Sequence, residues 1–184
     1  MLRIEAITKN SKDFPMVEAL YTSAFPQAEQ APMPYLLQRT KKDYVEFHAY
    51  YDDETFLGFT YSMTQENLTF IMYLAIDASQ RAKGYGSQIL SQIREAYPNN
   101  RIILNIEAED ETADNNAERK KRKQFYMRNG YSSAGVFLKI MGVTYELLVC
   151  SGDCTAKEFL RLNKKFMGSL LFLFFKPKLV NHSP

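Results

Sequence analysis

The stretch that most constrains the fold of this chain is residues 73–90, which reads YLAIDASQRAKGYGSQIL. It opens with an apolar run that ends at Asp77, as expected of a buried strand, and from Gly86 onward apolar residues recur at the spacing of one helix face. A strand therefore runs into a helix through a short basic loop with two glycines. Loop glycines can turn backbone N–H groups toward a ligand, and a helix N-terminus adds about half a positive charge, so this junction suits a phosphate or pyrophosphate.

The loop differs from two familiar phosphate-binding loops. A Walker loop needs G-x-x-x-x-G-K-[ST] and a dinucleotide-binding loop needs G-x-G-x-x-G, whereas residues 81–86 read R-x-x-G-x-G. This spacing resembles the acetyl-CoA loop of the GNAT superfamily of N-acetyltransferases, which also follows a strand and opens a helix. Ala78 and Ala82 stand where that superfamily often has proline and glycine. The alternative interpretation is an ordinary strand-turn-helix with a basic loop.

A second stretch, residues 116–131, resembles the late helix of the same superfamily. Tyr126 precedes the pair Gly130-Tyr131 at the spacing that is typical of the end of this helix. An asparagine that is common about two turns before the tyrosine is absent, because Arg119 occupies the position and Asn116 lies farther upstream. Two motifs in the expected order imply an acetyl-CoA-binding fold.

The remaining elements agree with the mixed α/β fold that this resemblance implies. We expect a mostly antiparallel central sheet with helices on both faces, a GNAT-like domain over residues 1–152, and a C-terminal helix and apolar tail over residues 153–184. The predicted strands are 2–6, 44–51, 55–64, 67–77, 101–107, 131–138 and 140–149. The predicted helices begin after Asp13, span 35–40, run from 86 to about 97, and cover 116–129 and 155–167.

Composition narrows the class of protein. At 184 residues with 46% hydrophobic content, one compact domain is expected, and a net charge of +2 argues against a nucleic-acid binder that relies on its overall field. The N-terminus lacks the apolar core of a signal peptide, and reduced thiols are expected at Cys150 and Cys154, so we expect a cytoplasmic protein. No metal site is expected, since neither His48 nor His182 has metal-ligating company.

The resemblance implies cofactor contacts that come mostly from the backbone. One strand would pair with the amide-bearing pantetheine arm of acetyl-CoA, and the loop amides would hold its pyrophosphate. The implied cofactor-binding residues are Leu74, Ile76, Arg81, Ala82, Lys83, Gly84, Tyr85, Gly86, Ser87 and Asn116.

Acetyl transfer to an amine also needs a group that protonates the leaving thiolate and a group that takes the proton of the ammonium. The resemblance makes Tyr126 the candidate general acid, since a phenol stays protonated at pH 7; a packed aromatic is the alternative role. Glu107 is the candidate general base because it ends a predicted inner strand, although such carboxylates are often only solvated. Glu109 and Tyr73 are lesser candidates.

Two runs of charge follow one another in the second half of the chain. The acidic residues of 107–114 would either attract a cationic acceptor or form a solvated loop. The basic residues of 119–123 would either lie near the adenosine phosphates or form an ordinary charged helix face.

The apolar segment LLFLFF, residues 170–175, is far too short to span a bilayer. Left exposed, it would be an aggregation hazard, so we expect it to be covered. Its own domain, a second chain in a homodimer and a membrane surface are the three possible partners.

The sequence therefore predicts a cytoplasmic, acetyl-CoA-dependent N-acetyltransferase. It would act on a primary amine of a small molecule or peptide, by direct attack in a ternary complex, with no nucleic-acid partner. The alternative is a non-catalytic acyl-CoA-binding or sensing module. The acceptor cannot be identified from the sequence, because the superfamily builds its acceptor pockets from the variable early helices and late hairpin.

Overall fold

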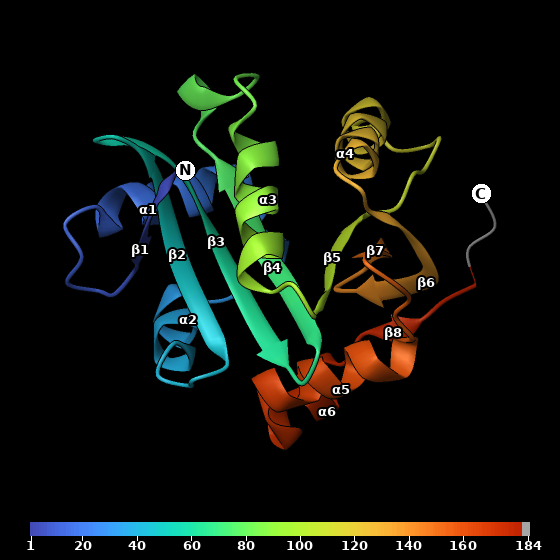
Figure 1. The fold of residues 1–184 in the computed structure, drawn as a ribbon. Coiled ribbons are helices and arrows are strands. Elements are labelled where there is room, and N and C mark those ends of the chain that lie inside the picture. The colour runs from blue at the N-terminus through green and yellow to red at the C-terminus, as the bar shows by residue number, and fades with distance from the viewer. Residues whose placement is uncertain (182–184) are drawn as a thin grey trace. The chain divides into compact units, whose positions relative to one another are not determined.

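The structure is a computed structural model that describes residues 1–181, so His182 lies outside the described residues. The chain forms two compact units. The first unit comprises residues 1–65 and 69–99, and the second comprises residues 66–68 and the chain from Asn100 onward. Both units are mixed α/β structures, which confirms the predicted fold class (Figure 1).

Four strands of the first unit lie side by side in chain order: β1 (Arg3–Ala6), β2 (Val45–Asp52), β3 (Thr55–Gln65) and β4 (Leu68–Ile76). The pairs β1–β2 and β2–β3 are antiparallel. The sequence patterns predicted all four strands to within one or two residues. Long strands with almost wholly buried side chains make this sheet the core of the unit.

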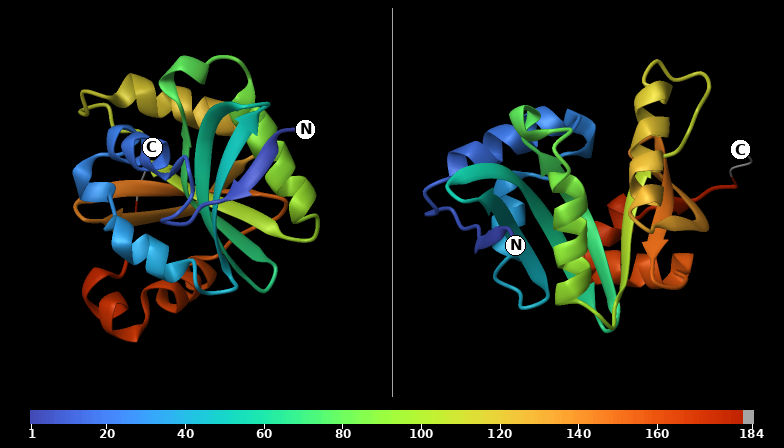
Figure 2. Two further views of the ribbon diagram at one scale, coloured as in Figure 1. Left: turned by 90° about the vertical axis from the view of Figure 1, so that its left-hand side faces the viewer. Right: turned by 45° about the horizontal axis from the view of Figure 1, so that its top comes forward.

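Three helices complete the first unit: α1 (Phe14–Ala24), α2 (Met33–Arg39) and α3 (Tyr85–Ala96). Figure 2 shows α1 and α2 on one face of the β1–β4 sheet and α3 on the other. Helix α2 begins two residues earlier than predicted. Pro34 lies in its first turn, where a missing N–H costs no helical hydrogen bond.

Tyr73 of β4 fastens the segment between α1 and α2 to the sheet. Its hydroxyl donates to the carbonyl oxygen of Glu29 (2.8 Å) and accepts from the amide of Ala31 (3.2 Å). Its ring makes edge contacts with Tyr21 and Phe25, at centroid distances of 5.0 and 4.9 Å. Tyr73 is therefore held as a structural residue, with its hydroxyl occupied by backbone groups.

The second unit contains the strands β5 (Arg101–Glu107), β7 (Val143–Cys150), β6 (Ser132–Ile140) and β8 (Lys178–Leu179), in that spatial order and with antiparallel pairing. Its helices are α4 (Asn116–Arg128), α5 (Ala156–Met167) and α6 (Ser169–Phe175). Sequence patterns missed α6 and β8. They also assigned Ile140 to the later strand, whereas the turn lies at Met141 and Gly142, which both have positive φ angles of 48° and 91°.

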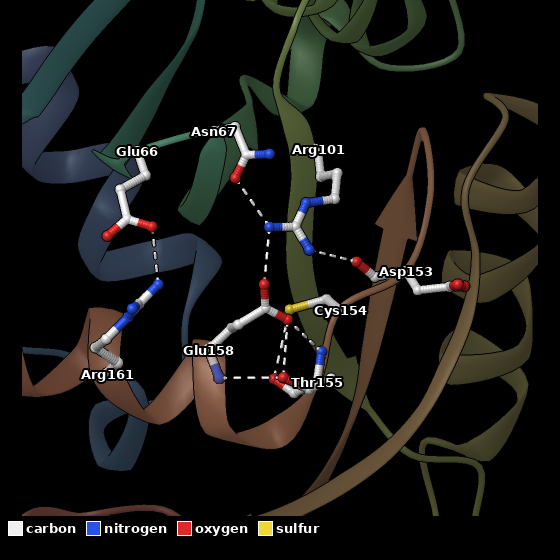
Figure 3. A network of polar contacts seen from close by, with 8 residues as sticks. All are labelled: Glu66, Asn67, Arg101, Asp153, Cys154, Thr155, Glu158 and Arg161. Carbon is white, nitrogen blue, oxygen red and sulfur yellow. Dashed lines mark hydrogen bonds and ion pairs between the residues drawn. The ribbon is translucent and has the colours of Figure 1, made fainter.

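Arg101 joins distant parts of the second unit (Figure 3). Its guanidinium contacts Glu158 of α5 at 2.8 Å, the Asn67 side chain at 3.0 Å and the carbonyl oxygen of Asp153 at 2.8 Å. Glu158 also exchanges hydrogen bonds with Thr155 in a capping box, which fixes the start of α5. The apolar side of α5 then packs inward with Phe159, Leu162 and Phe166 buried.

Candidate functional site

The predicted phosphate loop lies between β4 and α3 of the first unit. Asp77 ends the strand region and its carboxylate accepts from the Ser79 amide (2.9 Å), closing a short 3-10 turn, η2 (Ala78–Gln80). Gly84 is the N-cap of α3 and has φ +85°, while a Cβ added there would meet no atom within 4 Å. Glycine is thus needed at this position for its backbone conformation, and the space beside it is open.

The loop presents a row of unbonded backbone donors. The amides of Arg81 and Ser87 are used internally, bonding to the carbonyl oxygens of Ala78 and Gly84. Within residues 1–181, the five amides of residues 82–86 have no protein acceptor. Five amide donors at a helix N-terminus form a concentrated positive potential for an anion.

Side chains around the loop hold its conformation. The Arg81 Nε donates to the carbonyl oxygen of Ile76 (3.1 Å), and the Lys83 Nζ donates to Gln80 (2.9 Å). The Tyr85 hydroxyl donates to the Asp52 carboxylate (2.7 Å). Asp52 has no motif around it that would have linked it to the loop, which explains why sequence reasoning missed this contact.

The strand before the loop exposes alternate residues. Leu74 and Ile76 are half-buried, whereas Tyr73 and Ala75, which alternate with them, are buried. One lone pair of the Ile76 carbonyl already accepts from Arg81, so pairing with a ligand there uses the other lone pair or displaces the guanidinium.

Gly58 supports this strand from β3. A Cβ at Gly58 would lie 2.1 Å from the carbonyl oxygen of Ala75 and 3.0 Å from the Cα of Ile76. The close approach of two backbones explains why a glycine interrupts a strand whose residues are mostly buried. A glycine inside a strand pattern was the available sequence signal.

Glu107, at the end of β5 in the second unit, is buried and ion-paired. Its Oε1 lies 3.0 Å from Arg119 Nη2, and its Oε2 lies 3.0 Å from Arg122 Nη1. The Asn115 amide lies 3.4 Å from Oε2. Both oxygens of the candidate base are therefore engaged, Oε1 in an ion pair with Arg119 and Oε2 in hydrogen bonds from Arg122 and Asn115.

The acidic and basic runs mostly pair with each other. Lys120 contacts Glu111 at 2.7 Å, and Lys123 contacts the buried Glu146 of β7 at 2.9 Å and Glu109 at 3.6 Å. Together with the two ion pairs of Glu107, these contacts attach α4, a helix that has almost no apolar face, to the second unit. Glu107, Glu109 and Glu111 of the acidic run are therefore paired with basic residues of α4, while the loop between β5 and α4 is mostly exposed.

Tyr126 lies on α4, one helical turn after Arg122, and is buried. Its ring contacts those of Phe125 and Tyr131, at centroid distances of 5.1 and 5.7 Å. Burial raises the pKa of Tyr126 to about 12, against the opposing charge of Arg122. The phenol therefore remains a proton donor throughout the physiological pH range.

Asn116 has a structural partner within its own unit. Its amide oxygen accepts from the backbone N–H of Asp110 (2.9 Å), which ties the acidic loop to the first turn of α4. The side chain is buried. A cofactor contact from Asn116 would have to use the remaining capacity of this amide.

Two other features carry no predicted site residue. A cavity of about 90 Å³ in the first unit is lined by residues of β1, β2, β3 and α3 and by Tyr97, and it has room for only a few waters.

Cys150 and Cys154 are free and buried, and burial raises the pKa of the Cys154 thiol to about 11. Within residues 1–181, no cluster of three His, Cys, Asp or Glu side chains is arranged to hold a metal ion.

Solved structures with similar folds are acetyltransferases. A GNAT-family protein from Bacteroides thetaiotaomicron superposes with a TM-score of 0.70 at 18% identity, covering 92% of this chain and 98% of that one. Spermidine N-acetyltransferase from Vibrio cholerae, in complex with CoA and spermine, gives 0.63 at 10% identity, covering 80% and 94%. The ribosomal-protein-S18-alanine N-acetyltransferase from Escherichia coli gives 0.60 at 11% identity, covering 85% and 97%.

Sequence comparison gives the family directly. No curated protein matches the chain significantly. Residues 43–133 match the model of the acetyltransferase (GNAT) domain, a range that includes the loop at the start of α3 and all of α4. Residues 43–133 are therefore identified as a GNAT acetyltransferase domain, and the similar solved structures share the fold of the chain.

Proposed function

We propose that this protein transfers the acetyl group of acetyl-CoA to a primary amine. The observation that carries the proposal is the row of five unbonded amides at residues 82–86, beside the open space at Gly84. These donors fit the pyrophosphate of the cofactor, and the cationic side chains of Arg81 and Lys83 add to the attraction. The backbone groups of the half-buried residues Leu74 and Ile76 would pair with the pantetheine amides.

The chemistry assigned to the second unit needs two proton transfers. Acetyl-CoA, when bound, supplies a thioester that an amine can attack directly. Glu107 would take a proton from the ammonium of the acceptor so that the neutral amine can attack, and Tyr126 would donate its phenolic proton to the departing sulfur. A cysteine relay is not part of the proposal, because both thiols are buried and the raised pKa of Cys154 keeps it protonated.

The acceptor is proposed to be an amine of a small molecule or a peptide. The similar folds support this class, since the Vibrio cholerae enzyme is a spermidine N-acetyltransferase and the Escherichia coli enzyme acts on an alanine of a ribosomal protein. Two free thiols also suit the reducing cytoplasm, where we expect the enzyme to act.

One observation favours a second candidate function, a non-catalytic acyl-CoA-binding module. Both carboxylate oxygens of Glu107 are engaged by arginines, whereas a base must present an oxygen to its substrate. Calorimetric titration with acetyl-CoA, followed by detection of released thiol with polyamines, aminoglycosides and peptides, separates the two. Turnover with any amine supports the enzyme, binding without turnover supports the module, and absence of binding rejects both.

A further inference from the structure

Helix α6 exposes almost all of its apolar side chains. Five large residues on this seven-residue helix expose between 40% and 72% of their surface: Leu170, Leu171, Leu173, Phe174 and Phe175. Only Phe172 of the apolar run is half-buried. The described chain thus leaves uncovered the segment that we expected to be covered.

The exposed side chains form one continuous surface. Successive helical residues are about 100° apart, so the five exposed residues occupy an arc of about 200° and Phe172 lies outside that arc. A contiguous apolar surface of this kind marks a binding site for a protein or a membrane.

The charged residues that flank α6 in the sequence are all positive. Residues 159–181 contain five basic and no acidic side chains, and the basic ones lie at exposed positions: Arg161, Lys164, Lys165, Lys176 and Lys178. The whole chain carries +2, so the remainder of the chain carries −3. Arg161 is paired with Glu66 at 3.0 Å. Positive charge is therefore concentrated on the segment that carries the exposed apolar helix.

We propose that α6 and its flanking lysines bind the surface of a membrane that contains anionic phospholipids. The leucine and phenylalanine side chains would enter the boundary between headgroups and acyl chains, while the lysines would contact the headgroup phosphates. A second copy is a poorer occupant, since it would bring two basic segments together. Within residues 1–181 no helix is long and apolar enough to cross a bilayer, so the attachment would lie on the surface.

Sedimentation with lipid vesicles tests the proposal. We expect the full chain to sediment with vesicles of phosphatidylcholine and phosphatidylserine, and much less with phosphatidylcholine alone. The double variant Leu173→Glu/Phe174→Glu should lower partitioning by about tenfold or more, because it places charge where the acyl chains would lie. A matched control, Met16→Glu/Met141→Glu, also changes two exposed apolar residues and should bind like the unchanged protein.

Ionic strength and oligomeric state supply independent measurements. Raising the salt to 0.5 M should weaken binding to the anionic vesicles, because it screens the lysines. Circular dichroism checks that both variants remain folded. Absence of sedimentation with anionic vesicles, or equal sedimentation of the tail variant, would overturn the proposal. So would a dimer in light scattering that the tail substitutions convert to a monomer without any vesicle binding.

Discussion

Arg122 Nη1 lies 3.0 Å from Oε2 of Glu107, so the candidate base is bound to the helix that carries the candidate acid. Tyr126 follows Arg122 by one helical turn. Burial raises the pKa of Tyr126 to about 12, and the Arg122 charge acts in the opposite direction. One guanidinium therefore contacts one proposed catalytic group and influences the proton affinity of the other.

Replacing Glu107 with Gln separates a base from an ion-pair anchor. If Glu107 takes the substrate proton, Glu107→Gln should lower kcat/KM by about 10²-fold or more. Arg122→Gln is the matched control, because it breaks the same ion pair and keeps the carboxylate. It should lower the free energy of unfolding by about 1 kcal/mol with a much smaller loss of turnover. If both variants lost the same fraction of kcat/KM, and each loss matched the decrease in the free energy of unfolding, Glu107 would not be the general base.

Removing the phenol of Tyr126 tests the general acid. Tyr126→Phe keeps the ring packing and should lower kcat by about 10²-fold while the affinity for acetyl-CoA is retained. Because the pKa is raised to about 12, the phenol should stay protonated up to pH 10. An alkaline decline of kcat below pH 10 that disappears in Tyr126→Phe would contradict this protonation state. Unchanged kcat would leave Tyr126 as a packing residue.

A negative charge at Gly84 tests the phosphate loop. Gly84→Asp should weaken acetyl-CoA binding by at least about tenfold, because its carboxylate would face the pyrophosphate. Gly135→Asp is a matched control, since Gly135 also has a positive φ (66°) and open space around its Cα. Both variants incur similar backbone strain. Equal acetyl-CoA affinities in calorimetry would refute the loop assignment.

Adding one methyl group at Gly58 tests the close approach of β3 to β4. The new Cβ would meet the Ala75 carbonyl oxygen at 2.1 Å, so the backbone must move and Gly58→Ala should cost about 2 kcal/mol or more. Gly142→Ala meets no atom within 4 Å and should cost only its backbone strain, about 1 kcal/mol. Chemical denaturation measures both. Equal destabilisation would show that the strands relax freely around position 58.

Local sequence patterns predicted the elements that depend on local forces. The tight polar connections at residues 52–54 and 65–67 delimited β3, and the apolar spacing after Gly86 predicted α3, because both signals lie in neighbouring residues. The sequence predicted a hairpin with a very short connection at residue 139, whereas the turn lies at Met141 and Gly142, since methionine rarely takes a positive φ. Boundaries near such turns were therefore the least accurate part of the fold.

Contacts between distant side chains could not be predicted from sequence. The engagement of Glu107 by Arg119 and Arg122 depends on how α4 packs on β5, and a charged helix can face solvent equally well. Asn116 illustrates the same limit, because its bond to Asp110 depends on the shape of the loop. The loop at α3 was easier, since its glycines and helix start lie in one short stretch.

Glu158 should make stability depend on pH. Hydrogen bonds from Arg101 and from Thr155 lower the pKa of this carboxyl from 4.5 to about 2. Stabilisation by the ionised form is complete above pH 4.5 and is lost as the pH falls toward 2. The side chain is 26% exposed, so screening limits the effect to about 1–2 kcal/mol. Glu158→Gln should therefore be less stable than the unchanged protein at pH 7. In urea denaturation, the difference between their free energies of unfolding, the stability gap, should narrow below pH 4.5. A gap that stays constant down to pH 2.5 would show that the Arg101 contact does not depend on the carboxylate charge.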